Sequence, residues 1–264
     1  MRPRSTSVNL GYILIFICAF GCSHQRSDST SNETVAYAQP TSQPTSNPAS
    51  YDPHDTSRDA EGAAESAWGE ASFGQAIDPQ SLHRPEADQG VAVFAGGCFW
   101  CMEAPFESLT GVRAVYSGYT GGHESRPTYG QVAGSRTHHL EAVVVFYQPS
   151  LVTYEQLLHR YWRSVNPTQA DGQFADRGPQ YLTAIFAVDQ VQGVAAQRSK
   201  QALTASKKFS EPIAVKILKA RTFWPAEDYH QDYYKTNSAH YQRYKIGSGR
   251  AGYLKRVWGE SAQK

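Results

Sequence analysis

The sequence contains little sulfur and has almost no net charge. Four of its 264 residues are cysteine, and 25 Lys and Arg residues nearly balance 24 Asp and Glu residues, for a formal net charge of +1. The basic residues are scattered along the chain, which gives no indication of nucleic-acid binding. The apolar segment 10–20 is too short to span a bilayer comfortably. We therefore expect one medium-sized domain with extensions.

The N-terminus has the pattern of a targeting segment. Arg2 and Arg4 precede the apolar segment 10–20, and Ala19-Phe20-Gly21-Cys22 follows it. This order resembles a bacterial lipoprotein signal, so we expect residues 1–22 to be a signal segment cleaved before a lipidated Cys22. An ordinary cleaved secretory signal and a retained anchor are the alternatives. On the first interpretation the protein is exported to the bacterial cell envelope and is anchored in a membrane only through its N-terminal lipid, facing the periplasm or the cell surface.

Residues 23–89 differ in composition from the rest of the chain. Ser, Thr, Pro, Gln and Asn dominate, and branched apolar residues are few. Such a segment cannot bury enough apolar surface to offset its chain entropy, so we expect a disordered tether. The globular, catalytic domain is expected over residues 90–264.

The domain contains only two cysteines, Cys98 and Cys101, if Cys18 belongs to the signal and Cys22 carries the lipid. Structural disulfides in an oxidising compartment usually join separate segments. A bridge between residues three apart constrains very little chain, which favours a redox-active pair.

The residues around the two cysteines predict a strand that turns directly into a helix. An apolar run, 91–95, precedes Gly96 and Gly97, and we expect the helix to begin at or just after Cys98. A helix N-terminus stabilises a thiolate and lowers its pKa. Phe99 and Trp100, between the sulfurs, suggest an apolar seat for a substrate. A buried, inert thiol and ordinary core aromatics are the alternatives.

The remaining pattern predicts an α+β fold with helices packed against a sheet. Glu141 lies in an apolar strand, so its carboxyl group is either on an exposed face or protonated because it is desolvated. The expected strands are 91–95, 112–117, 140–147, 182–188 and 213–218, and the expected helices run from about 98 to 106, from an N-cap at Thr153 to 162, and over 190–209, with short helices near the C-terminus.

Histidines and cysteines raise the question of a metal site. The candidate ligands, which are His123, His138, His139 and His230 with the two domain cysteines, lack a tight ligand spacing. We therefore expect no metal.

Several motifs, in order along residues 91–259, resemble those of the A-type peptide methionine sulfoxide reductases. They are Gly97-Cys98-Phe99-Trp100, Gly118-Tyr119-Thr120-Gly121-Gly122, Pro127-Thr128-Tyr129, His139-Leu140-Glu141-Ala142-Val143, Asn166-Pro167-Thr168, Asp176-Arg177-Gly178-Pro179-Gln180-Tyr181 and Ala226-Glu227-Asp228-Tyr229-His230. The chain departs from the family at three places. It has Gly247-Ser248-Gly249-Arg250 where a distal Cys-Gly-Arg is common, it lacks the cysteine often found near Val132, and His138 stands where the family usually has glycine.

The resemblance implies a ferredoxin-like plait with a mixed sheet, flanking helices and long loops rich in Gly and Tyr. It implies thiol-dependent reduction of methionine-S-sulfoxide, peptide-bound or free, which repairs oxidised proteins. Cys98 would attack the sulfur and become a sulfenic acid, Glu141 would supply the proton, and Cys101, the only other cysteine of the domain, would resolve the sulfenic acid to a disulfide.

The same resemblance implies the remaining site residues and partners. Phe99 and Trp100 would accept the substrate methyl, Tyr129 and Tyr181 would bind the sulfoxide oxygen, and Asp176 would orient this region through water or a backbone amide. No bound cofactor is expected, a thioredoxin-type dithiol protein would be the external reductant, and we expect a monomer.

Two other classes of function remain as alternatives. A disulfide oxidoreductase usually has Pro, Gly or His between its two cysteines, which Phe99-Trp100 does not match. A non-catalytic surface lipoprotein would instead use its aromatic residues to bind a partner.

Overall fold

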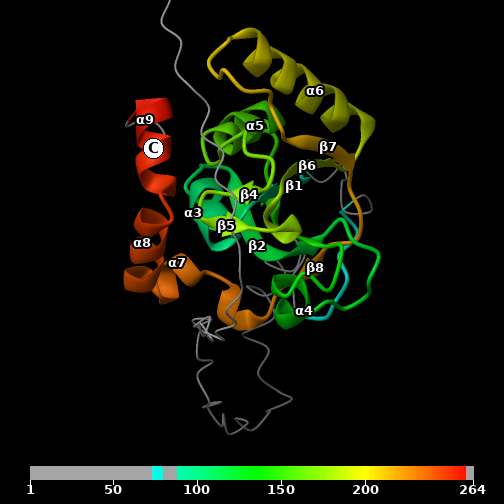
Figure 1. Cartoon of the computed structure of the whole chain (residues 1–264). Coiled ribbons are helices and arrows are strands. Elements are labelled where there is room, and N and C mark those ends of the chain that lie inside the picture. The colour runs from blue at the N-terminus through cyan, green and yellow to red at the C-terminus, as the bar shows by residue number, and fades with distance from the viewer. Residues whose placement is uncertain (1–72, 80–87, 260–264) are drawn as a thin grey trace, which may run out of the picture. The chain divides into compact units, whose positions relative to one another are not determined.

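The computed structural model describes residues 73–79 and 88–259 (Figure 1). Within these ranges, none of the helices has both the length and the apolar character needed to cross a membrane. The predicted signal segment and Cys22 lie outside the described residues.

A six-stranded sheet forms the centre of the domain, in the order β7-β6-β1-β3-β2-β8. Its strands are β1 (Gly90–Gly96), β2 (Val112–Thr120), β3 (Leu140–Tyr147), β6 (Thr183–Ala187), β7 (Lys216–Lys219) and β8 (Trp224–Pro225). The short strands β4 (Gly172–Gln173) and β5 (Asp176–Arg177) pair separately as a two-stranded sheet.

The strand directions confirm the predicted ferredoxin-like plait. β1 runs antiparallel to both β3 and β6, and β2 runs antiparallel to β3. β1 and β2 are therefore parallel and are joined through helix α3 (Trp100–Glu107), while β3 and β6 are parallel and are joined through α5 (Tyr154–Trp162). The order β6-β1-β3-β2 is that of the split βαβ motif. Helix α6 (Gln190–Ala205) then leads to β7, which extends the sheet parallel to β6.

The central strands are apolar on both faces because both faces are covered. Phe94 and Val143 belong to a core cluster that includes Met102 and Phe106 of α3 and Leu157 of α5. The opposite face has a second core cluster, which is closed by Ile77, Ala220 and Phe223 from extended segments together with strand residues such as Val93 and Val144. This double covering explains the continuous apolar runs in the sequence.

Most helices and strands begin and end within a few residues of the positions that the sequence predicted. Thr153 caps α5 as predicted, since its side chain accepts a hydrogen bond from the Gln156 N–H at 3.3 Å and Gln156 bonds back to the Thr153 N–H at 2.8 Å. β3 has the predicted bounds. α6 ends at Ala205, before Lys207 with φ +52°, rather than at 209 as expected. β7 begins at Lys216 rather than at 213.

Part of the range 23–89, expected as a tether, packs against the domain. Ile77 forms a bridge with Phe223, with hydrogen bonds of 2.8 Å in both directions, and its side chain is buried. The Asp88 carboxylate accepts hydrogen bonds from Gln148 and Ser150. The folded domain therefore includes residues before Gly90.

The C-terminal part consists of short helices, as the sequence indicated. These are α7 (Tyr233–Thr236), α8 (Ser238–Gly247) and α9 (Arg250–Trp258), and Figure 1 shows α8 and α9 in line beside α3. The remaining short elements are α4 (Tyr129–Ala133) and the 3-10 helices η3 (Pro179–Tyr181) and η4 (Asp228–His230).

Candidate active site

The turn between β1 and α3 positions Cys98 and depends on two glycines. Gly97 has φ +78°, and a Cβ there would lie 2.4 Å from Cβ of Gln173. A Cβ on Gly96 would lie 2.4 Å from Sδ of Met102. Only glycine fits these positions without displacing its neighbours. Cys98, 7% exposed, follows directly, and α3 begins at Trp100 with Phe99 as its N-cap, two residues later than the earliest start we expected.

Arg250 holds the same turn from the far end of the chain. Its guanidinium is buried and donates hydrogen bonds to the backbone oxygens of Gly96 at 2.9 Å and Ser164 at 2.7 Å. We did not identify Arg250 as a site residue from the sequence. The available signal was its position in the segment where the family commonly has Cys-Gly-Arg, since Gly249 and Arg250 keep the last two residues of that motif.

Cys98 and Cys101 are both free, buried thiols, and their ionisation differs from our expectation. Burial raises the pKa of Cys98 well above its ordinary value, and the negative charges of Glu141 and Asp176 act in the same direction. The hydrogen bond from Cys98 lowers the pKa of Cys101, and the positive charge of Arg250 adds to this effect. The sequence analysis expected the helix N-terminus to lower the pKa of Cys98, whereas in the substrate-free site burial raises it.

Glu141 is a buried carboxyl group beside the nucleophile candidate. It lies in β3 opposite Tyr119 of β2, is 2% exposed, and its Oε2 accepts the Phe99 N–H at 3.1 Å. Burial, with the negative charge of Asp176 as a further contribution, raises the pKa of Glu141 to about 8. Of the two alternatives that the sequence left open, the burial of Glu141 contradicts the exposed face and agrees with a desolvated carboxyl group.

Tyr129, the first residue of α4, and Tyr181, the last residue of η3, are near enough to this carboxyl group to interact with its charge. Burial raises the pKa of both phenols, and the charges of Glu141 and Cys98 raise both further, which places the two tyrosines around the same groups. Tyr129 begins α4, and its backbone N–H donates to the Glu227 carboxylate at 2.8 Å. Both hydroxyls are therefore neutral hydrogen-bond donors at physiological pH.

Asp176 reaches the site from β5. Its carboxylate accepts a hydrogen bond from the Tyr244 hydroxyl of α8, and burial raises its pKa. We expected Asp176 to act through water or a backbone amide. The structure identifies Tyr244 as its partner, a residue that the sequence analysis missed because no spacing links α8 to β5.

The two aromatic residues between the sulfurs belong to a larger aromatic group. The Phe99 ring lies 5.0 Å from the ring of His230, and Trp100 stacks on Tyr233 at 3.8 Å and 8°. The Trp100 indole N–H donates to Nδ1 of His230 at 3.1 Å, and Tyr129 lies 4.4 Å from the same imidazole. Burial lowers the pKa of His230 to about 4, so this ring is neutral. From the sequence we had considered His230 only as a metal ligand.

All eight predicted site residues of the domain thus converge on one region. Two adjacent sulfurs, a neutral carboxyl group, two phenols and an aromatic wall are held on a ferredoxin-like plait. These features define the site of a thiol-dependent oxidoreductase.

The comparisons with known proteins agree with this class. A family model described as peptide methionine sulfoxide reductase matches residues 90–262. The peptide methionine sulfoxide reductase MsrA of Bacillus subtilis is 52% identical over 169 residues, which cover 64% of this chain and 96% of that protein. The enzyme of the same name from Listeria welshimeri is 48% identical over 167 residues, or 63% of this chain and 94% of that protein.

Solved structures of similar proteins share the fold. Methionine sulfoxide reductase A of Corynebacterium diphtheriae aligns with a TM-score of 0.52 at 26% identity, covering 65% of this chain and 84% of that one. Mxr1 of Saccharomyces cerevisiae in reduced form aligns with a TM-score of 0.55 at 27% identity, covering 59% and 89%. The chain belongs to the peptide methionine sulfoxide reductase family, and it is an A-type enzyme that reduces methionine sulfoxide in a thiol-dependent reaction.

Proposed function

We propose that Cys98 is the nucleophile, Glu141 the general acid and Cys101 the resolving cysteine of this reaction. The sulfur of Cys98 attacks the sulfoxide sulfur, and the oxygen is transferred to Cys98 as methionine leaves, giving a sulfenic acid. The thiol of Cys101 then attacks the sulfenic sulfur, so that a Cys98–Cys101 disulfide forms and water is released. One methionine is produced for each disulfide.

The buried position of the Glu141 carboxyl group beside Cys98 is the observation that carries this assignment. This carboxyl group is bonded to the N–H of Phe99, the residue directly after Cys98, and its pKa of about 8 keeps it largely neutral at pH 7. A neutral carboxyl group can donate a hydrogen bond to the sulfoxide oxygen and then its proton, whereas a carboxylate would repel that oxygen. The proton lowers the barrier because it neutralises the charge that develops on oxygen.

The surrounding residues support binding of a methyl sulfoxide. Phe99 and Trp100 provide apolar surface for the methyl, and the neutral hydroxyls of Tyr129 and Tyr181 can donate to the oxygen. Asp176, held by Tyr244, orients this part of the site. An oxygen site, a methyl site and an exit for the longer chain together distinguish the two sulfur epimers. We propose specificity for the S-epimer, in free or peptide-bound methionine.

We propose that a thioredoxin-type dithiol protein reduces the disulfide and that no bound cofactor takes part. The chemistry needs only two electrons per turnover, which thiol–disulfide exchange supplies. Oxidised proteins are the proposed substrates, and we expect a monomer.

Single-turnover chemistry tests the roles of the two cysteines. Reduced Cys98→Ser should release no methionine from methionine-S-sulfoxide. Cys101→Ser should release one methionine per enzyme and then stop as a sulfenic acid, which dimedone traps and mass spectrometry detects. Equal loss of the first turnover in both variants would refute the assignment. Neither a disulfide oxidoreductase nor a binding protein would consume a thiol reductant in proportion to the sulfoxide added.

The cellular location is a separate proposal, based on the sequence of the N-terminus. Arg2, Arg4, the apolar segment 10–20 and Cys22 support export and lipidation. Two acyl chains give stable membrane anchoring, so wild-type protein should fractionate with membranes. Cys22→Ala should be released or left unprocessed and should keep full activity. A soluble wild-type protein whose mature N-terminus is not Cys22 would contradict lipidation.

A further inference from the structure

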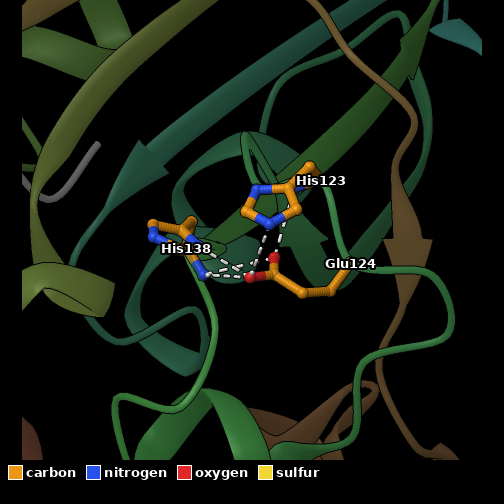
Figure 2. A group of neighbouring side chains, drawn as sticks. All are labelled: His123, Glu124 and His138. Atoms are coloured by element: carbon orange, nitrogen blue, oxygen red, sulfur yellow. Dashed lines mark hydrogen bonds and ion pairs between the residues drawn. The ribbon is translucent and has the colours of Figure 1, made fainter.

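A second cluster of chemically active side chains lies at the base of the loop between β2 and β3. His123 and Glu124 follow β2, His138 precedes β3, and both imidazoles point toward the carboxylate between them (Figure 2). Nδ1 of His138 lies 2.7 Å from Oε1 of Glu124, and Nε2 of His123 lies 3.6 Å from the same oxygen. One ligand atom from each residue can be chosen so that all three lie within 4.8 Å of one another.

The carboxylate in this cluster is fixed by the backbone of both neighbours. Glu124 accepts the backbone N–H of His123 at 3.2 Å and that of His138 at 3.1 Å. Two nitrogen ligands and one negatively charged oxygen are therefore already assembled.

A buried histidine holds the backbone on both sides of His123. His139 donates from Nε2 to the carbonyl oxygen of Glu124 at 2.8 Å, and its Nδ1 accepts the Gly122 N–H at 3.3 Å. A Cβ on Gly122 would lie 2.6 Å from both His139 and Glu124, which shows how closely these groups pack. Such supporting hydrogen bonds are typical of metal sites, where they fix the orientation of the ligands.

We propose that His123, Glu124 and His138 form a binding site for a divalent transition-metal ion of the zinc type. Imidazole and carboxylate suit Zn²⁺, Cu²⁺ and Ni²⁺, whereas two imidazoles disfavour Ca²⁺ and Mg²⁺. Three protein ligands and one water complete a tetrahedral Zn²⁺ site. The ion would take the place of the hydrogen bond between Nδ1 of His138 and the Glu124 carboxylate.

The geometry needs only small side-chain movements to accept the ion. Ligand atoms about 2.1 Å from a tetrahedral Zn²⁺ lie about 3.4 Å from one another. The two distances to Glu124 bracket this value. The side chains of His123 and His138 are 69% and 74% exposed, so both rings can rotate to close the remaining gap.

This site differs from the catalytic one and departs from our expectation that the chain has no metal. It uses no sulfur, and the thirteen residues between Glu124 and His138 belong to the loop that carries Tyr129. Sequence spacing therefore could not reveal it, because the pairing of Tyr119 with Glu141 brings the two loop ends together. An ion here would join the two ends of that loop.

Zinc binding by the full-length chain tests the proposal directly. Metal-free protein with Cys98 and Cys101 oxidised to the disulfide would be titrated with Zn²⁺ against a chromogenic chelator, so that these sulfurs cannot bind the ion. The double variant His123→Ala/His138→Ala should lose one equivalent of bound zinc relative to wild type. His159→Ala, which removes an exposed histidine of α5, is the matched control and should keep that equivalent. Circular dichroism checks that each variant is folded.

A second probe reports on the ligands themselves. Co²⁺ in place of Zn²⁺ should give the visible absorption of a four-coordinate nitrogen and oxygen site in wild type and His159→Ala, and the double variant should lack it. Glu124→Gln, which keeps the shape but removes the charge, should weaken Zn²⁺ binding. Zinc binding of equal stoichiometry and affinity in wild type and the double variant would overturn the proposal, as would a wild-type chain that binds no zinc.

Discussion

Replacement of Glu141 by glutamine should slow methionine release strongly and change its pH dependence. Glutamine fits the same space and can still donate a hydrogen bond, but it has no proton to give to the departing oxygen. General-acid catalysis typically contributes roughly 10²–10⁴-fold, and the first turnover of Glu141→Gln should slow by that factor. Substrate binding should change little, because the aromatic wall is unchanged.

The direction of the pH effect follows from the pKa of about 8. Wild type has the proton available below that pH and loses it above, so the rate of the reductive step should fall as the pH rises through about 8. Glu141→Gln should lack this alkaline decline. The free energy of unfolding should also fall as the pH rises, because the folded state binds the Glu141 proton more tightly than the unfolded state. In the unfolded state the pKa of this carboxyl group has its ordinary value of 4.5. Between these two pH values wild type should lose up to about 5 kcal/mol of folding free energy that the variant does not lose.

Glu103 provides a matched control for this experiment. It is a buried carboxyl group of α3, and burial raises its pKa also to about 8. Its Oε1 accepts a hydrogen bond from the Asp232 backbone rather than from the residue after Cys98. Glu103→Gln should alter the pH dependence of stability but keep the alkaline decline in rate. Rapid-quench measurement of methionine release from pH 6 to 9 checks both variants. A Glu141→Gln enzyme with a first-turnover rate within a few-fold of wild type would refute the reasoning.

Two further predictions concern the turn that holds Cys98. Gly97→Ala should lower the free energy of unfolding by roughly 2–5 kcal/mol, because φ is positive there and the new Cβ would meet Gln173. Gly252→Ala, at an open position of α9, is the control and should not lower it. Urea unfolding measures both variants, and equal stability of the two would contradict the packing argument. Arg250→Met leaves two buried carbonyl oxygens without this donor, so the free energy of unfolding should fall by roughly 2–6 kcal/mol. The same change removes a positive charge near Cys101, so the pKa of Cys101 should rise. Alkylation rates against pH report that pKa, and an unchanged profile would exclude the electrostatic role of Arg250.

Much of the fold was predictable because its signals are local. The strand 140–147 had the predicted bounds, since its apolar run is bordered by polar residues, and Thr153 identified the start of α5 through a capping pattern. The end of α6 depended instead on a positive φ at Lys207, which no residue preference at that position announces. Ile77 lies in a polar segment, and its place in the core depends on a bridge to Phe223, far away in the chain.

In the candidate site, too, some features were predictable from the sequence and others depend on contacts between distant segments. The order of the motifs was enough to select Cys98, Glu141 and the aromatic residues between the sulfurs. The ionisation of Cys98 was not predictable, because it depends on burial and on charges from other elements. The contacts of Asp176 with Tyr244 and of Trp100 with His230 likewise join segments that only folding brings together.

The sequence by itself determined the strand and helix periodicities, the Gly-Gly turn before Cys98 and the set of reactive residue types, because these depend on side chains that are neighbours in the chain. The tertiary structure decided which groups share a proton and which are desolvated. Glu141 becomes an acid with a pKa of about 8 only because the sheet and α3 enclose it. His123 and His138 meet at Glu124 only because β2 and β3 pair. Proton affinity and ligand geometry depend on distance and burial in space, and separation along the chain does not specify either one.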